Sequence, residues 1–90
     1  MKRFEVAIKA SALKDLEALD AAARERIKER IRLLADNPLP RGVEKLSARE
    51  SMYRVRKGNF RIVYTIDFDS SLVRVLAVAH RREVYRHLDN

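Results

Sequence analysis

Residues 53–64 read Tyr53-Arg54-Val55-Arg56-Lys57-Gly58-Asn59-Phe60-Arg61-Ile62-Val63-Tyr64, and they form the most informative segment of the chain. It contains four basic residues and no acidic residue, and basic and apolar side chains alternate along it. Such alternation is typical of strands with one buried face, and Gly58-Asn59 between the two runs is a hairpin turn signal. The stretch predicts a β-hairpin with arginines on one face and apolar side chains on the other. Because it contains no acid, we expect an anion from elsewhere to be the partner of the arginines.

A two-residue turn at Gly58-Asn59 fixes the register of this hairpin. It places Arg56 opposite Arg61, and Arg54 opposite Val63, on one face of the sheet. The apolar pairs then share the other face: Val55 with Ile62, and Tyr53 with Tyr64. A slip of one residue would mix the two faces, so the pattern favours this register.

The sequence before the hairpin predicts one strand and two helices. Alternation through Phe4, Val6 and Ile8 indicates the strand. Ser11 is the predicted cap of the first helix, and Asp20 is the predicted cap of the second. The expected buried stripes have helical spacing: Leu13, Leu16 and Leu19 in the first helix, and Ala23, Ile27, Ile31 and Leu34 in the second. The segment Asp36-Asn37-Pro38-Leu39-Pro40 ends the second helix, because proline cannot continue the hydrogen-bond ladder.

The sequence after the helices predicts a connecting loop over residues 38–51 and then three strands. The strands span about 52–57, 60–68 and 72–79, with a second turn at Asp69-Ser70-Ser71. Strict alternation puts these residues of the last strand on the bulky apolar face: Leu72, Leu76 and Val78. It puts these on the arginine face, where the small alanines should leave a depression: Val75, Ala77, Ala79 and Arg81. Arg74 does not fit this pattern, and residues 81–88 are expected to form a short helix or an extended arm.

These elements predict one α+β domain over residues 1–90. It consists of an N-terminal strand, a helical hairpin and a three-stranded antiparallel meander in one sheet, with the helices packed on one face. The formal net charge is +7, from 20 Lys plus Arg against 13 Asp plus Glu, which favours acidic partners such as nucleic acid. There is no cysteine, and the two histidines lack metal-ligand spacing, so we expect no metal and no cofactor. Neither a signal peptide nor a membrane span is indicated, and we expect a cytoplasmic protein.

Arginines gathered on one sheet face have a specific chemical use. Planar guanidinium groups bind phosphate through paired hydrogen bonds and stabilise the charge of a phosphoryl transition state. The residues predicted to share this face are Arg54, Arg56, Arg61 and Arg81. Alternatively, these side chains splay into water, or the carboxylates of Glu50 and Glu83 fold over them. Tyr85 either stacks on an unpaired base or anchors the tail, and His80 is a candidate general acid or base that alternation points to the other face.

The order of elements and several local strings resemble the RelE/ParE toxins of toxin–antitoxin systems. The strings are Ala12-Leu13-Lys14-Asp15-Leu16, Asn37-Pro38, Leu46-Ser47, Tyr53-Arg54-Val55-Arg56, Phe60-Arg61-Ile62-Val63-Tyr64 and His80-Arg81-Arg82-Glu83-Val84-Tyr85. The resemblance covers nearly the whole chain. It implies a type II toxin whose partners are a RelB-like antitoxin, the ribosome and mRNA.

RelE-like members cleave mRNA without a metal, by attack of a 2′-hydroxyl on the adjacent phosphate. The resemblance implies that Arg61 binds the transition-state phosphate, Arg81 assists the leaving group and Tyr85 stacks on a base. Arg54 and Arg56 occupy positions where the family has lysines, and Lys57 is a further substrate-binding candidate. Arginine is a poor base, which leaves as weak base candidates Lys57, Lys45, Glu50 and His80.

Two other functions remain open at this point. The ParE branch of the same superfamily inhibits DNA gyrase by binding and is not enzymatic. A toxin fold that has lost activity and serves as a binding module is the third possibility, since arginines replace the lysines.

Overall fold

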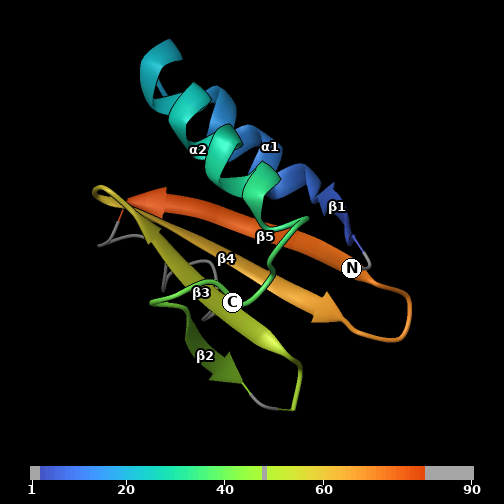
Figure 1. Ribbon diagram of the computed structural model, residues 1–90. Helices are drawn as coiled ribbons and strands as arrows, with labels where there is room; N and C mark the ends of the chain where they lie inside the picture. Colours follow the sequence, from blue (N-terminus) through green and yellow to red (C-terminus); the bar gives the residue numbers. More distant parts are fainter. Residues whose placement is uncertain (1–2, 48, 81–90) are drawn as a thin grey trace.

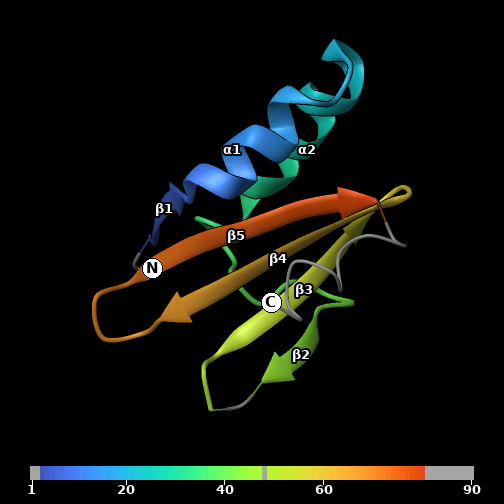
Figure 2. The same cartoon turned by 180° about the vertical axis from the view of Figure 1, so that it is seen from behind.

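The computed structural model describes residues 3–47 and 49–80. In this part of the chain the elements run β1 (Glu5–Ile8), α1 (Ala10–Glu17), α2 (Ala21–Leu33), β2 (Glu44–Ser47), β3 (Met52–Lys57), β4 (Phe60–Asp67) and β5 (Leu72–His80). The strands form one sheet in the order β1-β5-β4-β3-β2, in which only β1 and β5 are parallel. Figures 1 and 2 show both helices on the same side of this sheet. The predicted α+β architecture is confirmed, with one additional strand.

The hairpin of β3 and β4 has the predicted register. Arg56 is paired with Arg61, and Tyr53 with Tyr64. Gly58 has a φ of +61°, which suits the first central residue of a two-residue turn and which glycine adopts without steric cost. Tyr53, Val55, Ile62 and Tyr64 of the hairpin join the main core beneath the helices, and the two tyrosine rings stack at 6.0 Å between centroids.

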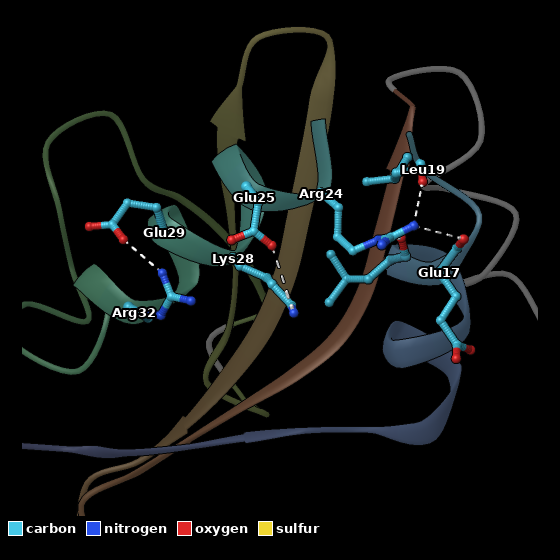
Figure 3. Close-up of polar contacts among 8 residues, drawn as sticks. Glu17, Leu19, Arg24, Glu25, Lys28, Glu29 and Arg32 are labelled. Carbon is cyan, nitrogen blue, oxygen red and sulfur yellow. Dashed lines mark hydrogen bonds and ion pairs between the residues drawn. The ribbon is translucent and has the colours of Figure 1, made fainter. Parts of the chain in front are cut away.

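The two helices begin in different ways. Asp20 caps α2 as predicted, because its carboxylate accepts a hydrogen bond from the backbone N–H of Ala23 at 2.8 Å. The prediction that Ser11 caps α1 is wrong, because α1 begins one residue earlier, at Ala10, and has no side-chain cap. Arg24 of α2 secures the other end of α1, since its guanidinium donates to the carbonyls of Leu16 and Leu19 (Figure 3).

The buried stripes of the helices follow the prediction in α2 and depart from it in α1. All four predicted positions of the second helix are buried: Ala23, Ile27, Ile31 and Leu34. In α1, Leu16 is buried but Leu13 is 47% exposed, and Ala12 takes the buried position instead. The small side chain of Ala12 therefore packs in the core, where the larger Leu13 was expected.

Side chains of α1 complete the edge of β5 beyond the end of β1. Pairing with β1 stops at Val75. Beyond it, the Ser11 hydroxyl donates to the carbonyl of Leu76 at 2.9 Å, and the Asp15 carboxylate accepts from the N–H of Val78 at 3.0 Å. These bonds satisfy backbone groups that a strand edge otherwise leaves open.

A β-bulge in β5 corrects the predicted faces of that strand. Val63 is paired with Ala77 and Tyr64 with Val75, so Leu76 is an extra residue in the ladder. Up to the bulge, the residues of β5 point to the face opposite to the predicted one. Val75 lies in the main core instead of on the arginine face, and Leu76 packs on the arginine side of the sheet instead of in the main core. The bulge also explains why Arg74 did not fit the strict alternation predicted for this strand. It is exposed and paired with Thr65, outside the core.

The predicted loop over residues 38–51 contains β2, a strand that sequence reasoning missed. It pairs antiparallel with β3, so that Glu44 lies beside Arg54 and Lys45 beside Tyr53. Its sequence, Glu44-Lys45-Leu46-Ser47, contains a single apolar residue and therefore shows no alternation that would indicate a strand. The turn between β4 and β5 lies where predicted, and the Asp67 carboxylate organises it by accepting from the N–H groups of Asp69 and Ser70. Those two N–H groups and the Ser70 side chain lower the pKa of Asp67.

The predicted arm over residues 81–88 lies outside the described residues. No helix in the described ranges is long and apolar enough to cross a membrane.

Candidate functional site

The arginines of the hairpin lie on the face of the sheet that the helices leave uncovered. Their neighbours along the strands, Tyr53, Val55 and Ile62, point into the core beneath the helices, and successive strand residues point to opposite faces. We call the surface formed by Arg54, Arg56 and Arg61 the arginine face. Arg56 has an exposed side chain, Arg61 is half-buried, and Arg54 is only 8% exposed.

The carboxylate of Glu44 in β2 lies against this face. Its oxygens lie 2.7 Å from the Arg54 Nη2 and 3.6 Å from the Arg56 Nη2. The hydrogen bond from Arg54 lowers the pKa of Glu44; burial opposes this, and the charges of Arg54, Arg56 and Arg61 add to the lowering. Glu44 is therefore held ionised and remains partly open to solvent, with a side chain that is 44% exposed.

Glu44 is a correction to the sequence analysis, which named Glu50 and Glu83 as the acids of this chain that could lie over the arginines. Like charges directly opposite in a sheet are destabilising, and Glu44 offsets the repulsion of the Arg56–Arg61 pair. The correction depends on the missed strand: only the pairing of β2 with β3 brings Glu44 beside Arg54, ten residues away in sequence. Buried Arg54 is thus engaged within the protein, whereas Arg56 presents its guanidinium to solvent.

The surroundings of Arg61 differ from the expected depression. Arg61 is paired with Ala79, which lies on the arginine face as predicted. However, Ala77 and Ala79 are 2% and 5% exposed, because they form a second small core with Val63. The partly buried side chains that pack against this cluster are Leu46, Met52 and Leu76. These apolar side chains lie on the same face of the sheet as the arginines, because Val63 is paired with Arg54 and Ala79 with Arg61. Arg61 also donates to the Phe60 carbonyl at 3.4 Å.

The base candidates named from the sequence lie away from the arginine face. Lys57 lines a hollow with residues of α2, and the Lys45 ammonium lies 5.9 Å from the centroid of the Tyr53 ring. His80 meets the Phe60 ring edge-to-face on the helix side, as alternation predicted. Glu50 lines a hollow at the far end of the strands, near the turn between β4 and β5. Glu44 is the acid–base candidate that the sequence analysis missed.

Arg81, Tyr85 and Glu83 lie outside the described residues, so their positions relative to Arg61 stay predictions. Within the described ranges, no three His, Cys, Asp or Glu side chains gather as a metal site would require. The described site is therefore a pair of opposed guanidinium groups with an ionised carboxylate beside them. The two guanidinium groups can bind a phosphate, and the carboxylate can accept a proton next to it.

The sequence and the fold match known toxins. Residues 6–85 match a family model described as the ParE toxin of the type II toxin–antitoxin system parDE. A putative toxin RelE1 of Methanocaldococcus jannaschii is 31% identical over 94% of this chain and 98% of its own length. The toxin RelE of Mycobacterium tuberculosis is 31% identical over 92% of this chain and 87% of its own length.

Solved structures agree with these sequence relatives. The archaeal RelE–RelB complex of Pyrococcus horikoshii superimposes with a TM-score of 0.79 at 28% identity, over 90% of this chain and 97% of that chain. The RelBE2 toxin–antitoxin complex of Mycobacterium tuberculosis gives 0.77 at 27% identity, over 88% of this chain and 99% of that chain.

Proposed function

We propose that this chain, which belongs to the RelE/ParE superfamily of type II toxin–antitoxin toxins, is a cytoplasmic, ribosome-dependent mRNA endoribonuclease. The observation that carries the proposal is the arginine face. Arg56 opposes Arg61 on the side of the sheet that faces away from the helices, with the Glu44 carboxylate beside Arg56. Opposed cations and an adjacent proton acceptor are the groups that phosphodiester cleavage by an internal hydroxyl needs. The RelE names of the relatives support the same branch.

In the proposed reaction the 2′-hydroxyl of one nucleotide attacks the adjacent phosphorus. The new O–P bond closes a cyclic phosphate, and the bond from phosphorus to the 5′-oxygen of the next nucleotide breaks. The 2′-hydroxyl proton passes to a base, and the departing oxygen takes a proton to become a 5′-hydroxyl. Arg61 and Arg56 hold the non-bridging oxygens, whose negative charge grows in the transition state.

We assign the base to Glu44, because arginine does not give up its proton in proteins. The guanidinium groups that lower the Glu44 pKa keep the carboxylate ionised and ready to accept a proton. They also weaken it as a base. When a phosphate engages Arg56, that arginine attracts Glu44 less, and the carboxylate becomes more basic as the substrate arrives. Arg54 then serves as a positioning residue, since it holds Glu44 at 2.7 Å.

The remaining roles follow the family resemblance. Arg81 assists the leaving group, and Tyr85 stacks on a base next to the scissile bond. The partner that restrains the toxin is an antitoxin. The solved relatives from Pyrococcus horikoshii and Mycobacterium tuberculosis are toxin–antitoxin complexes, and the net charge of +7 suits an acidic partner.

A second candidate function is inhibition of DNA gyrase, which the ParE description of the matching family model favours. Two assays on one preparation separate the candidates. Purified toxin is added to ribosomes stalled on a defined mRNA, and to a gyrase supercoiling reaction. The proposal expects mRNA cut within codons in the decoding site, leaving a cyclic phosphate and a 5′-hydroxyl, with supercoiling unaffected. Blocked supercoiling with intact mRNA would show that the protein is a gyrase inhibitor. No effect in either assay would favour an inactive toxin fold that serves as a binding module.

A further inference from the structure

The β-bulge at Leu76 decides which side of the sheet the end of β5 presents. Pairing with β1 and burial in the main core hold the first half of the strand, with Val75 on the helix side. Strict alternation from Val75 would put Ala77 and Ala79 on the helix side as well. Because Leu76 and Ala77 both pack on the arginine side, the alternation is shifted by one residue. Ala79 therefore lies on the arginine face, paired with Arg61.

The same shift concerns Arg81, which follows His80 directly after the end of β5 in the sequence. Without the extra residue, alternation would assign position 81 to the helix side. With it, alternation assigns Arg81 to the side of Arg61. Bulges beside active sites re-aim side chains in this way. The groups that hold the bulge in place therefore bear on the direction in which Arg81 leaves the strand.

Two side chains of α1 hold this bulge from the edge of β5 that β1 does not cover. α1 packs along β5 (Figures 1 and 2). The Ser11 hydroxyl donates to the carbonyl of the bulged residue, Leu76, at 2.9 Å, and the Asp15 carboxylate accepts from the N–H of Val78 at 3.0 Å. Ser11 is exposed, so water can replace its hydroxyl. Asp15 is half-buried and Val78 is buried, so loss of this carboxylate would deprive a buried backbone donor of its acceptor.

We propose that Asp15 is a positioning residue for mRNA cleavage, which acts through β5 to aim Arg81 at the departing 5′-oxygen. The inference rests on the proposed nuclease function and on the role that the family resemblance gives to Arg81. It also gives a use to the string Ala12-Leu13-Lys14-Asp15-Leu16, in which Ala12 and Leu16 are buried in the core and Asp15 bonds the strand. Asp15 approaches from the helix side, away from the arginine face, so its effect on the reaction is indirect.

Single-turnover cleavage of mRNA on stalled ribosomes tests this role with three variants. Asp15→Ala should slow cleavage by about 10–100-fold at unchanged ribosome affinity, because misplacement of a catalytic group costs about that much in rate. Asp15→Asn keeps an amide oxygen that can accept from Val78, and its rate should stay within about threefold of wild type. The control is Asp20→Ala, which also removes a carboxylate that accepts from a backbone N–H, at 2.8 Å, but at the start of α2. Its rate should likewise stay within about threefold of wild type.

A sulfur substitution in the mRNA shows whether Asp15 acts at the leaving group. In a second mRNA, sulfur replaces the bridging 5′-oxygen of the scissile phosphate, and it departs as a stable thiolate that needs little assistance. Asp15→Ala should cleave this mRNA within about threefold of the wild-type rate. On the natural mRNA, Asp15→Ala should add no further loss to Arg81→Ala, because both remove the same assistance. Equal losses on the two mRNAs, or equal losses in Asp15→Ala and Asp20→Ala, would overturn the proposal.

Amide hydrogen exchange followed by NMR tests the structural half of the proposal without RNA. In Asp15→Ala, the amide of Val78 should exchange about tenfold faster than in the wild type, while the amide of Val73, in the half of β5 that β1 covers, keeps its protection. Unchanged exchange at Val78 would overturn the proposal even if cleavage slowed. Absence of cleavage by the wild-type protein would refute the proposed function, whereas failures confined to the Asp15 variants would refute only this inference.

Discussion

Replacement of Arg61 by alanine should slow mRNA cleavage far more than replacement of any other arginine of the described hairpin. Arg61 is half-buried and held against the Phe60 carbonyl, so its guanidinium is pre-organised before substrate binds. Removing one such donor to a developing negative charge costs about 10²–10³ in rate, or roughly 3–4 kcal/mol of transition-state stabilisation. Arg56 has a side chain that is 63% exposed and is partly neutralised by Glu44. We therefore expect a smaller loss for Arg56→Ala, on the order of tenfold.

Single-turnover cleavage on stalled ribosomes measures these losses directly. Arg61→Lys should fall between wild type and Arg61→Ala, because it keeps the charge and loses the planar fork. Arg74→Ala is the matched control, since Arg74 is an exposed arginine on the same side of the sheet, opposite Thr65 and far from the hairpin turn. Circular dichroism melts confirm that each variant is folded. A rate for Arg61→Ala within about threefold of wild type, or a larger loss from Arg56→Ala, would refute the assignment.

Three further predictions concern other parts of the molecule. Glu44→Gln should slow cleavage by about 10²-fold with unchanged RNA affinity. In the wild-type protein the pKa of Glu44 is lowered, so the cleavage rate should not decrease until the pH falls below the usual pKa range of glutamate, as a pH–rate profile would reveal. Tyr64→Phe removes a 2.7 Å hydrogen bond to the Pro38 carbonyl and should cost about 1–2 kcal/mol in urea unfolding. Because burial raises the Tyr64 pKa, wild type should lose stability as the pH rises above about 10, and the variant should lose less. Asp20→Ala should cost about 1 kcal/mol through loss of the α2 cap, measured in the same way.

The register of the hairpin could be predicted from sequence because two independent signals agreed. Gly58-Asn59 set the loop length, and the alternation of apolar and basic residues allowed only one arrangement of faces. The second helix could also be predicted, since Asp20 is a typical cap residue and the buried side chains that follow it have helical spacing. Where the pattern is long and one face is buried, the sequence specifies the geometry closely.

The errors arose where local pattern does not carry the information. The bulge at Leu76 exchanges the faces to which the residues of β5 before it point, and alternation of apolar and polar residues does not reveal a single inserted residue. The exposure of Leu13 depends on how α1 is turned against the sheet, which its own spacing does not determine.

The most consequential omission was Glu44. It lies in a four-residue strand within what reads as a loop, and it approaches Arg54 only through sheet pairing. A cluster of cations in a folded protein calls for a nearby anion, and the segment before the hairpin contains the carboxylate that supplies it. The roles of Arg81 and Tyr85 rest on resemblance alone.

The central claim is that the arginine face promotes attack by the 2′-hydroxyl of bound mRNA. The most direct measurement compares two mRNAs on stalled ribosomes that differ in one atom, the 2′-oxygen of the nucleotide before the scissile phosphate. Cleavage by the wild-type toxin should disappear with the 2′-deoxy nucleotide, while binding to the ribosome persists. Cleavage of the 2′-deoxy mRNA at an undiminished rate would contradict the proposed chemistry, whatever the arginine variants do.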